Sequence, residues 1–431
     1  MYNAYITEIK NVRCHPNADR LDLVDCFGNT VCVSHGEFAE GDLAVYFPTD
    51  GQLSEEFCQV HDLVRRKDDA GNQCGGYLEP GKRNIRAIRL RGERSDGLAM
   101  PLRCLEYTGI DIRTLEAGFA FTTINGKEIC CKYIPRSNHR NQSCNAGNRT
   151  RQKKEIENYP YFVEHIDTPQ LRFNLSMFKP GDIICLTEKV HGTSSRNGYC
   201  LCKKPLNFLA KLFKLKPKTK YQDVAGTRRT IVSQENAGFY GTNAFRQKWA
   251  DKFKGKLYPG EQVFGEIAGF YEENSPIMAN GNNLKLRDKD FVNRYGQTTV
   301  FSYGCCPTGV LAPLNRYFIY RMTYTSPDGY VIEYPWDLVK LRAEQMGFEV
   351  VPELERFIYT TETDFLARIE KYLDTPSILD SRHIREGVVV RALNATTFKV
   401  AKEKSWGFKV LEGIIKDIAT TPDLEELEET L

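Results

Sequence analysis

Short runs of alternating hydrophobic and polar residues fill the first third of the chain. Examples are AYITEI, RLDLVDC, NTVCVS and DLAVYFP, and turn residues such as Gly28-Asn29 and Gly41-Asp42 separate them. The pattern predicts β-strands, because a half-buried strand alternates its side chains between two faces and Gly, Asn and Asp favour turns. Many short strands in sequence favour a small all-β barrel over residues 1–130.

The pattern changes after residue 130. Residues 132–154 contain seven Lys or Arg and no acid, which predicts an exposed linker over 131–154. From residue 155, strand patterns such as DIICLTEKV, QVFGEIAGFY, TTVFSYGCC and REGVVVRAL mix with the helical stretches WDLVKLRAEQMG and ETDFLARIEKYLD. We therefore expect an α+β domain over 155–420. The run DLEELEETL predicts a solvated acidic tail over 421–431.

Composition narrows the class of protein. The 59 Lys and Arg nearly balance the 56 Asp and Glu, so net charge alone does not indicate nucleic acid. No apolar run approaches the roughly 18 residues of a membrane span, and the start MYNAYITEIK lacks the features of a signal peptide. With no CxxC, the 14 cysteines predict reduced thiols rather than a zinc site. We expect a soluble, cytoplasmic protein with no membrane contact and no obligate protein partner.

One lysine-rich segment has two interpretations. Residues 203–220 carry seven lysines and no acid, with Leu and Phe interleaved. The segment can be a surface loop or amphipathic helix whose apolar residues pack on the body of the protein. It can also contact phosphates or a membrane surface.

The N-terminal strings carry the first family resemblance. HPNADRLDLVDC, starting at His15, and the later RAIRLRGERSDGLAMPL resemble the OB-fold module of one subfamily of RNA ligases. Such a barrel contacts oligonucleotides through aromatic side chains and cations. Arg89 and Arg91 alternate with apolar residues, so we expect them to share the solvent face of a strand. The basic residues of this region are Arg83, Arg86, Arg89, Arg91 and Arg94.

The second resemblance begins at TEKVHGTSSR. Lys189 stands two residues before His191-Gly192, and this KxHG is similar to the nucleotidyl-accepting motif of ATP-dependent RNA ligases, which belong to the covalent nucleotidyltransferases. Later strings resemble the following motifs of that family in the expected order. They are GTRRT with Arg229, VFGEIAG with Glu266, TVFSYG with Tyr303, REGVVVR with Glu386 and TFKVAKEK with Lys399. Each match alone is ordinary, since a surface cation, a strand-end salt bridge or a core aromatic would explain it.

The resemblance implies a role for each residue. Lys189 would attack the α-phosphate of ATP, which requires a neutral amine. Lys399 and Arg229 would offset the charge that develops on the phosphate. Glu266 and Glu386 would hold Mg²⁺ or Mn²⁺, through water because Mg²⁺ dehydrates reluctantly.

The nucleoside contacts are also implied by the resemblance. Tyr303, with Phe301 as the alternate, would stack on the adenine. The neighbours of the lysine, namely Glu188, Val190, Gly192 and Thr193, would line the nucleotide site. His191 would point to RNA, because DNA ligases and capping enzymes carry Asp there.

Two departures from the family pattern stand out. The last family motif commonly has two lysines spaced KxK, whereas Lys399 is followed by Val400-Ala401 and the next lysines are Lys402 and Lys404. The barrel also precedes the catalytic domain, while the usual ligase has it afterwards, and we expect no full domain after Lys399.

These features predict an ATP-dependent RNA ligase. The expected fold is multidomain, an all-β OB barrel followed by an α+β nucleotidyltransferase domain of antiparallel sheets with flanking helices. The expected partners are RNA strand ends or nicks. The alternatives are a DNA ligase or capping-type nucleotidyltransferase, against which His191 counts, and a non-catalytic RNA-binding relative.

Overall fold

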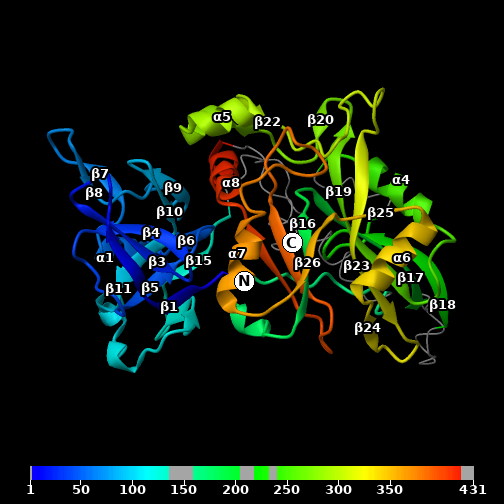
Figure 1. Ribbon diagram of the computed structural model, residues 1–431, viewed down its shortest axis with the longest axis horizontal. Helices are drawn as coiled ribbons and strands as arrows, with labels where there is room; N and C mark the ends of the chain where they lie inside the picture. Colours follow the sequence, from blue (N-terminus) through cyan, green and yellow to red (C-terminus); the bar gives the residue numbers. More distant parts are fainter. Residues whose placement is uncertain (1, 135–158, 204–217, 233–239, 419–431) are drawn as a thin grey trace, which may run out of the picture. The chain divides into compact units, whose positions relative to one another are not determined.

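The computed structural model describes residues 2–134, 159–203, 218–232 and 240–418 (Figure 1). Two compact units form the chain: Met1–Arg136 with Lys409–Asp417, and Ser137–Phe408 with Ile418–Leu431. The predicted linker beyond residue 134, residues 204–217 of the lysine-rich segment and the acidic tail lie outside the described ranges. Within those ranges, no helix is long and apolar enough to cross a membrane.

The first unit consists of short antiparallel strands, as the alternating pattern predicts. One sheet has the order β11-β5-β1-β12 and another the order β2-β3-β4. Its core joins Ile6, Val45 and Phe47 of the strands to Phe57 of α1 (Glu55–Val60). The strands are β1 (Ala4–Glu8), β2 (Lys10–Cys14), β3 (Leu21–Cys26), β4 (Asn29–Ser34), β5 (Leu43–Phe47), β6 (Gly51–Leu53), β7 (Arg65–Lys67), β8 (Gln73–Gly75), β9 (Ala87–Leu90), β10 (Glu93–Asp96), β11 (Leu98–Pro101), β12 (Ala120–Phe121), β13 (Thr123–Ile124), β14 (Lys127–Glu128) and β15 (Cys130–Lys132).

The β9–β10 hairpin corrects one expectation about the arginines. Leu90 pairs with Glu93, so Arg91 and Gly92 form a two-residue turn, with φ of 43° and 99°. Two left-handed residues suit a turn that matches the twist of a hairpin. Arg91 therefore lies in the turn and does not share a strand face with Arg89. The cross-strand partner of Arg89 is Arg94, and all three arginines are exposed.

The described part of the second unit has two large sheets and the two-stranded sheet β21-β22, with antiparallel strand pairing throughout, except where β25 joins β23. The four-stranded sheet has the order β26-β16-β27-β28, and the larger sheet has the path β18-β17-β19-β23-β24. The strands are β16 (Ile183–Lys189), β17 (Thr193–Lys203), β18 (Thr219–Gly226), β19 (Glu261–Glu272), β20 (Ser275–Pro276), β21 (Gly281–Asn282), β22 (Thr298–Thr299), β23 (Asn315–Thr325), β24 (Val331–Glu333), β25 (Glu349–Val350), β26 (Glu353–Ile358), β27 (Gly387–Ala392) and β28 (Val400–Lys404).

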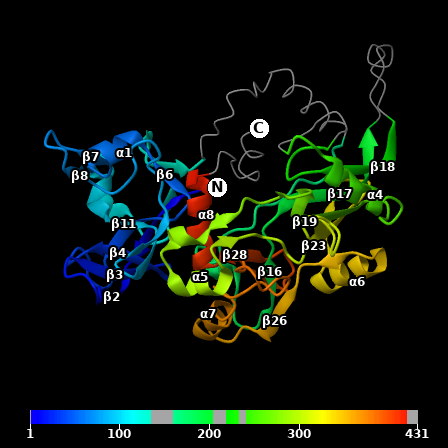
Figure 2. The ribbon, with the colours of Figure 1, turned by 90° about the horizontal axis from the view of Figure 1, so that it is seen from above.

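Helices flank both sheets of this unit (Figure 2). α7 (Glu362–Glu370) starts where the Thr361 hydroxyl accepts a hydrogen bond from the Asp364 N–H, a standard N-cap. Phe365 and Ile369, four residues apart, bury one face of α7 against the four-stranded sheet. The other helices of this unit are α4 (Ala244–Phe253), α5 (Lys289–Tyr295) and α6 (Trp336–Met346), with 3₁₀ turns at Leu175–Met177 and Asn283–Leu286. The 3₁₀ turns Leu102–Thr108 and Ile112–Thr114 belong to the first unit, and most of α8 (Trp406–Ile418) is assigned to that unit as well.

The predicted strand TTVFSYGCC is wrong over most of its length. Only Thr298–Thr299 is extended, as β22, and the chain then turns. Tyr303 has φ of 49° and Gly304 has φ of 78°, both left-handed, and a strand cannot continue through such residues. The expected succession of an all-β unit and an α+β unit of antiparallel sheets is otherwise confirmed.

Candidate active site

Both sheets of the second unit line one open cavity of about 760 Å³, a volume that includes part of the solvent at its mouth. Its size is within the range of small-molecule sites. The residues that line it are His165, Ile166, Thr168, Thr187, Glu188, Lys189, Val190, Ser194, Arg228, Glu266, Tyr320, Arg321, Val351, Val389, Arg391, Phe398, Val400 and Lys402.

Strand pairing arranges the floor of this cavity in rows. Lys189 of β16 pairs with Gly387 of β27, which pairs with Lys404 of β28. The second row is Thr187, Val389 and Lys402, and the third is Cys185, Arg391 and Val400. Alternate residues of a strand share a face, so these side chains point to the same side of the sheet. Residues of the opposite face, such as Leu186, Val388 and Ala401, enter the core with α7.

Lys189 and Glu386 form an ion pair at the end of this floor. The Lys189 Nζ lies 2.7 Å from Glu386 Oε1, and the Lys404 Nζ lies 4.0 Å from the same oxygen. The Glu386 side chain is almost fully buried, whereas Lys189 remains partly open to the cavity. The structure thus brings together two residues that lie almost 200 positions apart in the sequence.

Glu266 reaches the cavity from β19 of the opposite sheet. Its Oε2 accepts a hydrogen bond from the Ser194 hydroxyl, with 3.4 Å between the oxygens. Gly192 allows β17 to start close to β19, because a Cβ at Gly192 would lie 2.4 Å from the Ile267 carbonyl oxygen. The need for glycine here comes from strand packing.

The lysines on the cavity side of the last motif come later in the sequence than Lys399, the lysine that was expected there. Lys399 precedes β28, and its Nζ lies 4.0 Å from Asp182 Oδ2, outside the cavity lining. Lys402 lines the cavity, and Lys404 approaches Glu386. Lys402 and Lys404 have the KxK spacing that Lys399 lacks, and strand alternation explains why these two lysines share one face of the sheet.

The arginine of GTRRT is also displaced by one residue. Arg229 is 42% exposed and does not line the cavity. Arg228 does, with its side chain only 10% exposed and its Nη1 3.3 Å from Asp167 Oδ1. Of the two adjacent arginines, Arg228 is placed to meet a ligand.

Tyr303 and Phe301 lie outside the cavity lining and surround His191. The Tyr303 hydroxyl accepts a hydrogen bond from the His191 backbone N–H at 2.7 Å. The His191 ring packs edge-on against Phe301 and Phe408, with 4.8 Å between ring centroids in each case, and its Nδ1 lies 3.8 Å from Glu386 Oε2. Burial raises the pKa of Tyr303 well above its usual value, so its hydroxyl stays protonated.

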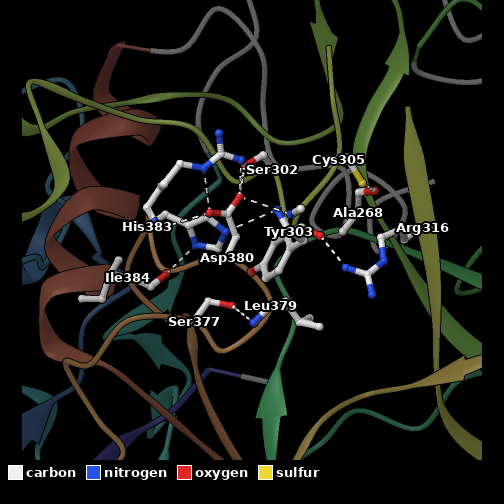
Figure 3. A network of polar contacts seen from close by, with 12 residues as sticks. Ala268, Ser302, Tyr303, Cys305, Arg316, Ser377, Leu379, Asp380, His383 and Ile384 are labelled. Atoms are coloured by element: carbon white, nitrogen blue, oxygen red, sulfur yellow. Dashed lines mark hydrogen bonds and ion pairs between the residues drawn. The ribbon is translucent and has the colours of Figure 1, made fainter. Parts of the chain in front are cut away.

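A buried polar network fixes the turn that carries Tyr303 (Figure 3). The Tyr303 N–H donates to His383 Nε2, and His383 Nδ1 faces the Ile384 carbonyl at 3.0 Å. Asp380 accepts hydrogen bonds from the Ser302 hydroxyl and the Gly304 N–H. Burial lowers the pKa of His383, which keeps the ring neutral and able to accept from Tyr303.

Tyr320, on β23, and Phe398 are the tyrosine and phenylalanine among the described residues that line the cavity. Val389 of the four-stranded sheet belongs to the same lining, and the Tyr320 hydroxyl lies 3.2 Å from His165 Nδ1. No motif in the sequence points to Tyr320. The signal that could have found it is the long strand NRYFIYRMTYT, which pairs with the strand carrying Glu266.

The remaining predicted residues divide into two groups. Val190 and Glu188 line the cavity, but the Glu188 carboxylate also accepts hydrogen bonds from the Ser377 hydroxyl and the Ile378 N–H. Thr193 is buried outside the lining, and its hydroxyl accepts from Arg246 at 2.6 Å. Thr193 thus has a structural partner.

The described residues contain no cluster of three or more His, Cys, Asp or Glu side chains that could hold a metal ion directly. Two buried carboxylates are available: Glu266 lines the same cavity as Lys189, and Glu386 lies 2.7 Å from the Lys189 Nζ. Such a pair fits a divalent ion that keeps most of its water, as Mg²⁺ does.

Comparison with protein families decides the affiliation. The RNA ligase family model matches residues 182–410, more than half of the chain, and includes the two sheets that line the cavity. This chain belongs to the RNA ligase family. An OB-fold domain model matches residues 3–102 of this RNA ligase family member, in agreement with the barrel of the first unit.

Solved structures resemble the whole chain. A mutant of Naegleria gruberi RNA ligase with ATP and Mn is 16% identical, with a TM-score of 0.57, covering 94% of this chain and 98% of the other. The same ligase with PPi is 16% identical, with a TM-score of 0.55 and coverages of 96% and 98%. At this identity the likeness shows a shared fold. Among curated protein sequences, nothing matches this RNA ligase family member.

Proposed function

We propose that this protein joins a 3′-hydroxyl and a 5′-phosphate end of RNA through a lysyl-AMP intermediate on Lys189. The observation that carries the proposal is the placement of Lys189 in a cavity that Glu266 of the opposite sheet also lines, with Glu386 Oε1 2.7 Å from the Lys189 Nζ. A surface lysine would have no such setting. The family affiliation supports RNA as the substrate.

In the first step, the Lys189 Nζ would attack the α-phosphate of ATP. A P–N bond forms, the bond to pyrophosphate breaks, and the amine must first lose a proton, for which Glu386 Oε1 is a nearby acceptor. Lys402, Lys404 and Arg228 would offset the charge on the phosphates. The AMP would then pass to an RNA 5′-phosphate, and the 3′-hydroxyl would displace it.

The site fits a purine nucleotide and a divalent ion. Tyr320 and Val389 would enclose the base, in place of the Tyr303 and Phe301 that the sequence suggested. Glu266 and Glu386 would hold Mg²⁺ or Mn²⁺ through water, and the ion would supply charge neutralisation at the phosphates. ATP and Mn accompany the solved Naegleria ligase mutant, which supports this choice.

The first unit would contact the RNA strand. Its exposed arginines, Arg86, Arg89, Arg91 and Arg94, suit a polyanion, and an OB barrel is a common platform for oligonucleotides.

Incubation with α-labelled ATP and denaturing electrophoresis tests the proposal. We expect a covalent label on the wild-type chain with ATP and much less with GTP. Lys189→Ala and Lys189→Arg should both abolish it, since a guanidinium stays protonated. Label that persists on Lys189→Ala would reject this lysine, preferential labelling by GTP would indicate capping chemistry, and no label on the wild type would indicate a non-catalytic relative.

A further inference from the structure

Tyrosines gather on the face of the larger sheet opposite to the cavity. Ser194 of β17 lines the cavity, and Tyr199, five residues further along the same strand, points to the other face. Tyr324 of β23 shares this other face, because it pairs with Glu261, whose carboxylate binds Arg342 of α6 outside the cavity lining. The proposed chemistry uses neither tyrosine.

The rings of this group are close together and open to solvent. Tyr221 of β18 pairs with Leu201 and therefore lies on the same face as Tyr199. The ring centroids of Tyr199 and Tyr221 are 5.6 Å apart and the ring planes are inclined by 33°. Both rings are partly exposed, and Tyr258, in the turn before β19, is 61% exposed. Neighbouring exposed rings offer flat surfaces on which another flat group can stack.

Lysines stand beside these rings, at the described ends of the lysine-rich segment. Lys203 ends β17, and Lys218 and Lys220 stand at the start of β18, which lies beside β17 (Figure 2). All three are exposed and form no ion pair with a described residue. The sequence from 203 to 220 contains no acid, and β18 carries a single one, Asp223.

The lysines occupy both faces of the paired strands. Lys203 is four residues from Tyr199 and shares its face, whereas Lys220 pairs with Cys202 and lies on the cavity side of the sheet. A polyanion that passes around the outer strand β18 would thus meet cations on either side. Among the described residues, β18 is the edge of the larger sheet, so no further strand covers it.

This surface is remote from the reacting lysine. From Ser194 at the cavity to Lys203 the strand runs nine residues, which is roughly 31 Å at a rise of about 3.4 Å per residue. A molecule that has one end in the cavity and also reaches Tyr199 must be long. A nucleotide does not span that distance, whereas an RNA strand does.

The side chains match single-stranded RNA in two respects. Tyrosine rings stack on bases, which every single strand exposes, and ammonium groups attract the phosphates between the bases. An RNA duplex would present its phosphates but keep its bases stacked inside. A partner surface on a protein would need acids to face the lysines as well as an apolar patch to face the rings.

We propose that Tyr199, Tyr221, Lys203, Lys218 and Lys220 form a tyrosine–lysine surface that binds single-stranded RNA away from the cavity. The proposal rests on the proposed function, which makes RNA the substrate. It assigns the described ends of the lysine-rich segment to phosphate contact, one of the two interpretations that the sequence left open.

Fluorescence anisotropy with a single-stranded RNA of about 20 nucleotides, longer than the site of one OB fold, tests the rings. The probe has a hydroxyl at both ends, so it cannot be sealed. We expect Tyr221→Leu to weaken binding by the full chain roughly tenfold and Tyr221→Phe, which keeps the ring, to bind as the wild type does. A strand of the same length without bases should bind the wild type more weakly and lose nothing further in Tyr221→Leu.

The salt dependence of the same binding tests the lysines. Changing Lys203, Lys218 and Lys220 together to Ser should lower the slope of log K against log salt by roughly 2, since each phosphate contact on a single strand contributes about 0.7. The control variant removes the same charge by changing three exposed lysines elsewhere in the second unit to Ser, and its slope should not change. These control residues are Lys179, Lys285 and Lys371.

Equal binding of the base-containing strand by the wild type and Tyr221→Leu would overturn the proposal, and so would equal slopes in the two lysine variants. A dimer that sedimentation detects in the wild type and not in Tyr221→Leu, with RNA binding unchanged, would assign the face to self-association instead. If Tyr221→Leu does not fold by thermal melting, the strand without bases and the lysine variants decide. Failure of the proposed function is separate, because it appears as a wild-type chain that ATP does not label, whatever the RNA binding.

Discussion

The Tyr303 hydroxyl accepts a hydrogen bond from the backbone N–H of His191, 2.7 Å away. This bond joins a turn after β22 to the segment that follows Lys189, more than 100 residues earlier in the chain. Tyr303 is fully buried and held by His383 and by Arg316, whose Nη1 donates to the Tyr303 carbonyl at 2.8 Å. The position of the loop at His191, directly after Lys189, therefore depends on a side chain that lies outside the cavity.

Tyr303→Phe removes this acceptor and keeps the ring. A partly buried N–H without a partner costs about 1–3 kcal/mol, so the loop should lose its fixed position. We expect self-adenylylation to slow roughly 10- to 100-fold. Sealing of pre-adenylylated RNA, which does not need the lysine as nucleophile, should change much less, and single-turnover assays of the two steps measure the difference.

Tyr295→Phe is the matched control. Tyr295 is also buried, but its hydroxyl has no hydrogen-bond partner among the described residues. Its removal should leave both steps near wild-type rates. An equal loss of both steps in Tyr303→Phe, together with a lower melting temperature, would mean that Tyr303 only stabilises the fold.

Lys402→Ala and Lys399→Ala should differ sharply. Lys402 lines the cavity, whereas Lys399 points to Asp182. Loss of a cation at the reacting phosphate should cost about 100-fold or more in self-adenylylation, and loss of a surface ion pair about 1 kcal/mol of stability at most. Self-adenylylation rates measured on the two variants at one ATP concentration test this difference. A near wild-type rate for Lys402→Ala would place Lys402 outside the chemistry.

The adjacent arginines allow a similar comparison. Arg228→Ala should raise the KM for ATP or lower the adenylylation rate at least about tenfold, because a buried guanidinium lines the cavity. Arg229→Ala, at an exposed position, should stay within about twofold. Steady-state kinetics on both proteins provide the test, and the reverse order would return the role to Arg229.

RNA binding by the first unit should depend on Arg89 and Arg94, which face each other across the β9–β10 hairpin. Replacing both with Ser removes two cations that can meet phosphates. We expect the slope of log K against log salt to fall by roughly 1.5, as release of about two counterions requires. Filter binding at several salt concentrations measures it; an unchanged slope would move the RNA path elsewhere on the chain.

His383 should make the stability of the protein pH-dependent. Burial lowers its pKa below the ordinary 6.5, so at mildly acidic pH the unfolded state binds the proton and the folded state does not. Stability should therefore fall as pH drops below about 6.5, by up to about 1.4 kcal/mol per pH unit. Denaturant unfolding between pH 5 and 7 should show a smaller slope for His383→Gln; equal slopes would contradict a neutral buried ring.

Periodicity and spacing located most of the fold, because strand alternation and helix caps are local properties. The helix after Pro335 and the one capped by Thr361 lie where their patterns predict. The strand prediction for TTVFSYGCC was wrong because a short apolar run can also form a buried turn. Nothing local reveals that Tyr303 takes a left-handed conformation.

The site residues show where local reasoning stops. Lys189 and Glu266 line one cavity and Glu386 pairs with Lys189, because Lys189 ends β16, Glu266 lies within β19 and Glu386 directly precedes β27. The choices between Arg228 and Arg229, and between Lys399 and Lys402, depend on which face of the chain meets the cavity. Which face of the strand a residue occupies is set by pairing with distant strands, such as that of Val389 with Lys402. The sequence around each residue does not reveal this pairing.

The pairing of β27 with β28 also limits how this protein can vary in length. Residues 393–399 connect the two strands, and Arg391 pairs with Val400. A single-residue insertion or deletion that shifted this register would turn Lys402 and Lys404 toward the apolar core and bring Ala401 and Glu403 to the cavity. Functional relatives should therefore keep the number of residues between Glu386 and Lys402. The amino acids at positions 393–399, including Lys399, can vary among these relatives.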